Sequence, residues 1–349
     1  MNNVVNYYAG GNTAKGFVHF FDSNFQDLDR LFILKGGPGT GKSTLMKRIG
    51  IKWQEQGYGV EWIHCSADYG SVDAIIIPSI RAGIVDGTSP HIIEPALPGI
   101  VDEYVNLGVA WDRKKLLPNK ENVQRVNANI KESYRKAYHY LERALGELNK
   151  ELQNASSKEF SALTKWAENW IRTWLKEKNT VRKPIHKHRF YGAFTPDGYH
   201  HFAEELLEKV QKRFFLTGSL LVPQIMEKII RAAISFGYDL HIYYNALDPE
   251  RVEMIIFPEL NVALFDHTLF PEEIVAKEND EWVPFSEQTL KKENNEKLDE
   301  YIAKAIEYLG KTSKFRNELE SYYIEAMDFA IVEEIGKEIE GELARMLTE

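Results

Sequence analysis

The chain has 349 residues, of which 44% are hydrophobic and 27% charged, and its formal net charge is −9. This composition excludes a disordered, collagen-like or fibrous chain, and the length predicts about two domains. The single cysteine excludes a disulfide framework and a cysteine-based zinc or iron–sulfur site, and the acidic balance argues against a broad nucleic-acid-binding face. The sequence has no transmembrane stretch and no signal-peptide pattern, so we expect a cytoplasmic protein.

The first predicted elements in the chain are a short hairpin near residues 8–21 and a buried strand at residues 31–34. The strand is followed by GGPGTGKS at residues 36–43, which fits the phosphate-loop pattern G-x-x-x-x-G-K-[ST] in full. Apolar residues at helical spacing then predict a helix that starts at the end of the loop. The residues expected to hold phosphates are Gly36, Gly37, Pro38, Gly39, Thr40, Gly41, Lys42, Ser43 and Thr44.

This pattern has a physical reason that points to ATP and Mg²⁺ as ligands. The glycines let successive backbone N–H groups turn towards phosphate oxygens, and the helix N-terminus favours an anion. Lys42 is expected to reach the β- and γ-phosphates and to act in catalysis. The Ser43 hydroxyl is expected to be a Mg²⁺ ligand.

The second half of the chain repeats the first at a shift of 182 residues, which becomes 180 after the phosphate loop. The loop of the second half is two residues shorter, with Val222 in place of Lys42 and Pro223 in place of Ser43. Without these groups it should not hold a triphosphate, so we interpret the second half as a domain that kept its fold and lost its ligand. A feature present only in the first half is then the better candidate for chemistry.

Strands that alternate with helices predict an α/β protein with two tandem P-loop NTPase-like domains and parallel sheets. We place a nucleotide-binding domain at residues 1–180 and a degenerate repeat at 188–349. Each is expected to carry a helical hairpin, at about residues 120–178 and 290–347. An apolar stripe runs along residues 123–152, and a stripe of tryptophans in residues 160–174 is interpreted as hairpin core.

Two further residues of the first half are candidates for chemistry. Asp86 ends an apolar strand, as a Mg²⁺-holding aspartate of such a site does, although Asp266 survives in the repeat. His91 follows shortly after and has no counterpart in the repeat, so we predict a catalytic role for it near the γ-phosphate. Cys65 is interpreted as an inert small residue. Four histidines at 186, 188, 200 and 201 are a weaker metal-site alternative because no carboxylate or cysteine is spaced to complete them.

On these motifs the chain resembles a bacterial family of tandem P-loop NTPases known as predicted ATPases and sometimes as nucleotide kinases. The matching stretches are Gly10 to Phe17, Gly36 to Ser43, His64 to Ser66 and Asp86 to His91. The resemblance implies ATP binding and names no substrate. Three interpretations stay open: an ATPase whose halves dock against each other, a nucleotide or small-molecule kinase, and a non-hydrolysing nucleotide sensor. We favour the ATPase because no compact arginine-rich lid is visible, and we consider Arg189, Arg213 and Arg231 as sources of a charge from the second half.

Overall fold

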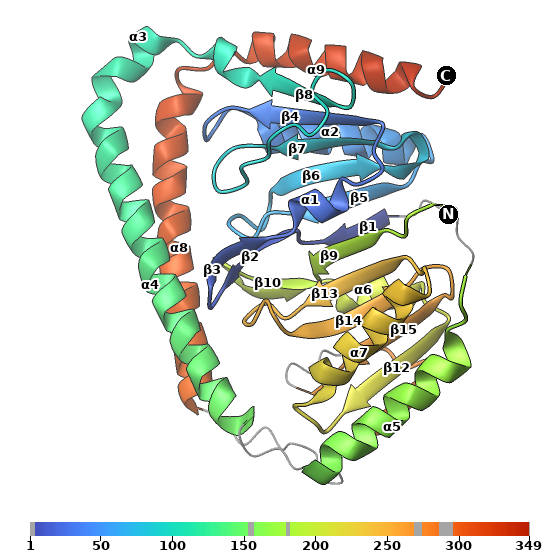
Figure 1. Cartoon of the computed structure of the whole chain (residues 1–349). Coiled ribbons are helices and arrows are strands. Elements are labelled where there is room, and N and C mark those ends of the chain that lie inside the picture. The colour runs from blue at the N-terminus through green and yellow to red at the C-terminus, as the bar shows by residue number, and fades with distance from the viewer. Residues whose placement is uncertain (1–3, 153–156, 179–181, 269–273, 286–295, 349) are drawn as a thin grey trace.

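The computed structural model describes residues 4–152, 157–178, 182–268, 274–285 and 296–348. It is an α/β structure in which two six-stranded sheets of mostly parallel strands lie next to each other, with helices packed around them (Figure 1). Each sheet is formed by one half of the chain, so the predicted α/β class with two repeated halves is confirmed. None of the helices in the described part of the chain is both long and apolar enough to span a bilayer.

The first sheet has the strand order β1-β5-β6-β7-β4-β8. Its strands are β1 (Val4–Tyr7), β4 (Arg30–Lys35), β5 (Val60–His64), β6 (Val72–Ile77), β7 (Ala82–Asp86) and β8 (Asp102–Asn106). The neighbouring pairs are parallel except where β6 pairs with β5 and β7. The expectation of an all-parallel sheet is therefore wrong at β6, which lies in a segment predicted only as a connection.

The direction of β6 follows from the short connection before it. Only residues 65–71 separate β5 from β6, whereas a parallel crossover needs about a dozen residues or more. Asp68 closes the turn because its carboxylate accepts hydrogen bonds from Gly70 N at 3.2 Å and from Ser71 Oγ at 2.5 Å. Asp68 thus has a structural task at the turn.

Shorter elements and helices complete the first half. A small hairpin pairs β2 (Gly10–Thr13) with β3 (Gly16–His19), as predicted. The helices are α1 (Phe21–Asn24), α2 (Lys42–Glu55), α3 (Arg113–Leu116), α4 (Lys120–Leu152) and α5 (Ser157–Trp174). Helix α2 forms because Leu45, Met46, Ile49 and Trp53 recur at helical spacing, and all four are buried against the first sheet.

The second half repeats this arrangement with the order β16-β12-β15-β14-β13-β9 and the same single reversed strand, β14. Its strands are β9 (His186–Phe190), β10 (Gly192–Thr195), β11 (Gly198–His201), β12 (Lys212–Thr217), β13 (Leu240–Tyr244), β14 (Val252–Phe257), β15 (Val262–Asp266) and β16 (Glu281–Pro284). Its helices are α6 (Ala203–Glu208), α7 (Val222–Ser235), α8 (Glu296–Ile324) and α9 (Phe329–Arg345). Helix α7 begins at Val222 as α2 begins at Lys42, which agrees with the sequence shift.

The two halves share one apolar core. Tyr8 and Phe190 exchange backbone hydrogen bonds of 3.0 and 2.8 Å where the edge strands β1 and β9 meet. Apolar side chains from both sheets then form one continuous cluster, which includes Tyr7, Ile63, Phe215 and Met254. The halves are therefore packed as one body.

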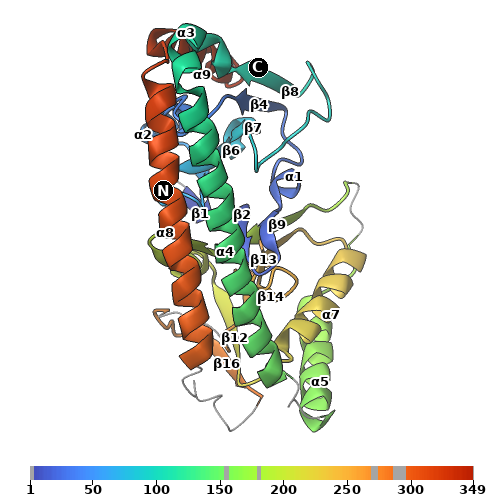
Figure 2. The ribbon, with the colours of Figure 1, turned by 90° about the vertical axis from the view of Figure 1, so that its left-hand side faces the viewer.

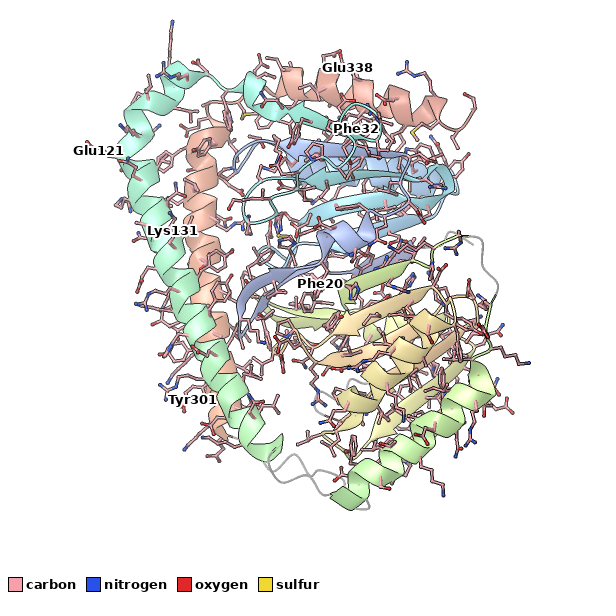
Figure 3. The ribbon with its side chains drawn as sticks, viewed as in Figure 1. Phe20, Phe32, Glu121, Lys131, Tyr301 and Glu338 are labelled. Atoms are coloured by element: carbon pink, nitrogen blue, oxygen red, sulfur yellow. The ribbon has the colours of Figure 1, made fainter. Side chains whose placement is uncertain are left out.

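The long helices do not form the predicted hairpins. Helix α4 lies alongside α8 of the other half, with Ala137, Leu141, Ala305 and Leu309 buried between them (Figures 1 and 2). The opposite face of α4 carries exposed charged side chains such as Glu121 and Lys131 (Figure 3).

Each sheet is also covered by a helix from the other half of the chain. The tryptophans of α5 pack on the second sheet, with the rings of Trp170 and Phe257 5.3 Å apart. Helix α9 packs next to α2, where Val332 joins the apolar cluster formed by α2 and the first sheet. The Trp stripe is thus core, but its partner differs from the prediction, and the division into residues 1–180 and 188–349 does not separate two self-contained cores. An apolar stripe specifies that a helix is buried and leaves its partner unspecified.

A buried ion pair joins the two halves next to the apolar cluster that both sheets share. Arg189 is fully buried and donates to Glu61 at 2.6 Å and to Asn24 at 2.7 Å, while the Tyr7 hydroxyl donates to Glu61 at 2.9 Å. Burial alone would raise the pKa of Glu61, but Arg189 and Lys187 outweigh it and lower the pKa to about 2.

We predict that Glu61→Gln lowers the free energy of unfolding by about 3–5 kcal/mol at neutral pH, because it leaves Arg189 buried without its partner. Since the pKa of Glu61 rises on unfolding from about 2 to its usual 4.5, the contribution is present above pH 4.5 and is lost as the pH falls towards 2. Denaturant titrations at pH 7 and pH 3 measure both effects. The control is Glu307→Gln in an exposed pair on α8, expected to cost about 0.5 kcal/mol or less. If Glu61→Gln and Glu307→Gln lower the free energy of unfolding equally, the Glu61–Arg189 pair does not stabilise the interface between the halves.

Candidate functional site

The loop between β4 and α2 has the backbone that its glycines predict. Gly39 and Gly41 adopt φ angles of +68° and +84°, in the left-handed region where a side chain is strained. Gly41 is the N-cap of α2, so the loop leads directly into a helix N-terminus. Such a terminus carries unpaired N–H groups and a positive dipole end, both of which favour an anion.

Lys42 lies across this loop. Its ammonium donates hydrogen bonds to the carbonyl oxygens of Gly36 at 3.0 Å and Gly37 at 2.7 Å, and lies 3.6 Å from Asp86 Oδ2. Burial lowers the pKa of Lys42, and Asp86 partly opposes that effect. The first half therefore places a buried cation inside a glycine-rich loop.

Asp86 reaches the loop because β7 lies beside β4 in parallel, with Asp86 opposite Leu34. Its other carboxylate oxygen accepts from Thr88 N at 2.8 Å and Thr88 Oγ1 at 2.5 Å. The Ser43 hydroxyl accepts from Val72 N at 3.1 Å, and Thr44 is exposed. The structure thus brings Lys42 and Asp86 together as predicted, with Ser43 one residue further along α2.

The outer face of the loop is covered by the second half of the chain. A Cβ built on Gly39 would lie 2.9 Å from Ile324 Cγ1 and 3.0 Å from the backbone oxygen of Glu320. The side chain of Tyr323 approaches Gly37, and Phe329 approaches Gly41. The end of α8 and the start of α9 therefore pack directly on the phosphate loop. At Gly39 this packing leaves no room for a Cβ.

Arg316 of α8 is the arginine that the second half brings to this place. It lies close enough to Tyr134 of α4 to oppose part of the rise that burial causes in the pKa of the Tyr134 hydroxyl. Burial lowers the pKa of Lys42, and the nearby positive charge of Arg316 lowers it further. The same charge also acts to lower the pKa values of Asp73 and His91. Sequence reasoning missed Arg316, because α8 was assigned to a hairpin of its own half.

The arginines considered from the sequence lie elsewhere. Arg189 is paired with Glu61 at the interface of the halves, and Arg213 is buried against Asp280 at 2.5 Å. Arg231 is exposed and pairs with Glu227 one turn earlier on α7. None of these three approaches the phosphate loop, so those candidates are wrong.

The equivalent place in the second half is filled from within the protein. Arg251 donates to Asp266, the counterpart of Asp86, at 2.6 Å and to the backbone oxygen of Leu220 at 3.2 Å. The arginine and the aspartate are 6% and 2% exposed. The Arg251 guanidinium thus pairs with the strand-end aspartate of the second half, as the Lys42 ammonium does in the first half. In the sequence alignment of the two halves, the counterpart of Arg251 is Ser71.

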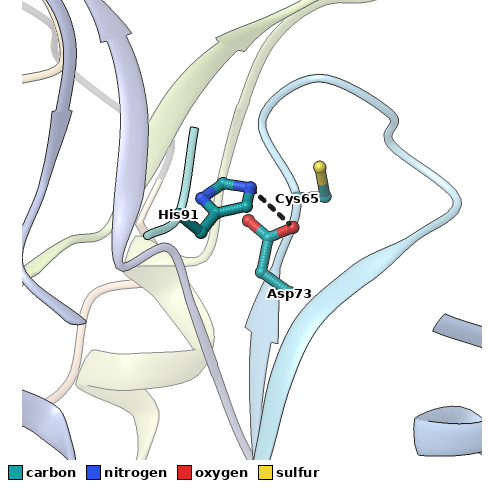
Figure 4. Close-up of side chains that lie close together, drawn as sticks. All are labelled: Cys65, Asp73 and His91. Atoms are coloured by element: carbon teal, nitrogen blue, oxygen red, sulfur yellow. Dashed lines mark ion pairs between the residues drawn. The ribbon is translucent and has the colours of Figure 1, made fainter. Parts of the chain in front are cut away.

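His91 is buried beside the loop rather than exposed in it. Its Nε2 lies 3.4 Å from Asp73 Oδ1, and its ring is held edge-on by Phe17 and Phe21. Together with Cys65 the pair forms a buried cluster, shown in Figure 4. Burial lowers the pKa of His91, so its imidazole is neutral at neutral pH. Asp73 was missed because it lies on β6, and the four histidines of β9 and β11 form no such cluster among the described residues.

Comparisons of the chain with protein-family models, with curated proteins and with solved structures find no match. The functional assignment therefore depends on the geometry of the site.

We predict that Gly39→Ala lowers the free energy of unfolding by about 1–3 kcal/mol more than Gly99→Ala. Both glycines have a similar left-handed φ, +68° and +74°, but only the Cβ at residue 39 would meet α8. Denaturant titration of the two variants isolates the contact between loop and helix. Equal losses would mean that α8 does not pack on the loop in solution.

Proposed function

We propose that the protein binds ATP with Mg²⁺ at the loop Gly36 to Ser43 and hydrolyses it there, with the second half as a covalently attached partner and not a second enzyme. The observation that carries the proposal is the position of Lys42: a buried ammonium inside a glycine loop at a helix N-terminus, 3.6 Å from the strand-end carboxylate of Asp86.

Each part of the site has a chemical task under this proposal. The loop N–H groups and Lys42 would bind the β- and γ-phosphates, and Ser43 and Asp86 would hold Mg²⁺, which neutralises charge on the phosphate oxygens. Asp86 lies 3.6 Å from the Lys42 ammonium, and Ser43 follows Lys42 in the chain. Carboxylate and hydroxyl oxygens are hard donors of the kind that Mg²⁺ prefers.

Arg316 supports the idea of a built-in partner. Many P-loop sites need a positive charge from a neighbouring domain to stabilise the transferring phosphoryl group. Here α8 brings that charge from the other half of the same chain, so its effective concentration is high without an oligomer.

A kinase and a non-hydrolysing sensor are the competing functions. ATP turnover alone indicates an ATPase, whereas turnover that requires an added nucleoside, nucleotide or other small molecule indicates a kinase. Tight binding without turnover under either condition favours the sensor. One assay with and without a panel of acceptors separates the three.

We predict that Lys42→Ala weakens Mg-ATP binding about a hundredfold or more, because charge-assisted hydrogen bonds to the phosphates are lost. Calorimetry on the full chain measures the effect. The matched control is Val222→Ala, the equivalent position at the start of α7, which should leave the dissociation constant unchanged. Wild-type affinity in Lys42→Ala would remove the basis of the proposed site.

We also predict that Arg316→Ala slows ATP turnover about a thousandfold while Mg-ATP affinity changes only a few-fold, and that Arg316→Lys restores part of the rate. Arg125→Ala is the control, because Arg125 makes an exposed ion pair with Glu318 that also joins α4 to α8. If Arg316→Ala and Arg125→Ala turn over ATP at the same rate, the second half supplies no charge to the reaction.

A further inference from the structure

A second cluster of reactive side chains lies beside the phosphate loop. Cys65 directly follows β5, Asp73 lies on β6, and His91 lies in the segment after β7. One ligand atom of each lies within 4.8 Å of those of the other two, and all three side chains are buried (Figure 4). The register of the β5–β6 pair shifts between Ile63 and His64, as that of the β13–β14 pair does between Tyr243 and Tyr244, so this irregularity belongs to the shared fold.

The cluster is not satisfied by the protein itself. Asp73 and His91 are 3% and 6% exposed, yet Asp73 Oδ2 and His91 Nδ1 have no hydrogen-bond partner. A buried carboxylate oxygen or imidazole nitrogen without a partner costs about 1–3 kcal/mol, so such atoms call for a bound ion or water.

The second half provides an internal comparison at the same positions. Asn245 replaces Cys65 and Glu253 replaces Asp73. Glu253 accepts hydrogen bonds from Asn245 Nδ2 at 2.6 Å and from the Tyr191 hydroxyl at 2.8 Å, so both of its oxygens have donors. In the first half the counterpart of Tyr191 is Ala9, so the hydroxyl donor is missing and Asp73 Oδ2 has no hydrogen-bond partner. The counterpart of His91, Pro271, lies outside the described residues.

We propose that Cys65, Asp73 and His91 bind a divalent transition-metal ion of the zinc class, with a fourth position left for water or another small ligand. The soft thiolate and the borderline imidazole, with the hard carboxylate as a third donor, favour zinc-like ions over Mg²⁺. A thiolate and a carboxylate together balance the charge of a divalent ion, and imidazole binds metals in its neutral form. The exclusion of cysteine-based zinc sites made from the sequence therefore applies only to sites with several cysteines, because Asp73 and His91 complete this one.

The proposed ion has a place of its own beside the nucleotide site. Asp73 and Asp86 are close enough that the charge of Asp86 adds to the raised pKa of Asp73, after the larger effect of burial. The hard oxygen donors Ser43 and Asp86 belong to the predicted Mg²⁺ site, whereas the sulfur and nitrogen donors belong to this cluster. The two sites thus differ in donor type and can be tested separately.

The test is a titration of the full-length chain, freed of metal with a chelator and kept without nucleotide, first with Co²⁺ and then with Zn²⁺. We expect one equivalent of Co²⁺ to give a thiolate-to-cobalt charge-transfer band, and Zn²⁺ to displace it. Cys65→Ser should abolish the band, and Asp73→Asn and His91→Gln should each weaken binding about tenfold or more. The control is His139→Gln, an exposed histidine on α4, which should bind Co²⁺ as the wild type does.

Absence of the charge-transfer band in the wild-type chain overturns the proposal, and that outcome needs no variant to fold. A band that persists in Cys65→Ser overturns it as well. Because no nucleotide is present, either result is independent of whether the protein hydrolyses ATP. Circular dichroism of each variant separates the loss of a ligand from the loss of the fold.

Discussion

The contact between the phosphate loop of the first half and the α8–α9 segment of the second half is the constraint on which the rest of the molecule depends. Gly39 can meet the backbone of Glu320 only because it lacks a Cβ, whereas a Cβ at Gly41 would make only ordinary van der Waals contacts with α9. Gly39 therefore has two tasks, the backbone shape of the loop and the close approach of α8. The same contact brings Arg316 towards Lys42, and it requires α8 to run the length of the molecule beside α4.

The two halves have the same fold with different polar groups at the loop before the first long helix of each half. Strand order, the reversed strand, the register shift and the start of the helix are the same in both. What differs is the polar groups: Lys42 lies inside the glycine loop 3.6 Å from Asp86, whereas Arg251 donates to the buried Asp266 at 2.6 Å. A buried carboxylate needs a counter-charge, so the repeat could lose the loop lysine only with another cation in its place.

Local patterns predicted the local features of this protein, and the partners of each feature required the structure. The GGPGTGKS loop, the helix that follows it, the strand-end position of Asp86 and the repeated halves all follow from residue types and spacing. Strand β6 was missed because its six residues, Val72–Ile77, follow a short turn and were assigned to a connection, and Asp73 was missed with it. The exchange of α5 and α9 between the halves has no signal in the chain, since an amphipathic helix does not encode which surface covers it. The same is true of the pairing of α8 with α4, which places Arg316.

The central claim is that the second half completes the nucleotide site of the first half. Hydrogen–deuterium exchange of the full-length chain with and without Mg-ATP tests this claim most directly, because it reports opening segment by segment. The account predicts that Mg-ATP protects residues 36–44 together with residues 316–332 of α8 and α9, while residues 217–222 of the second loop do not change. Protection of the second loop, or of the first loop with no change in α8 and α9, would contradict it.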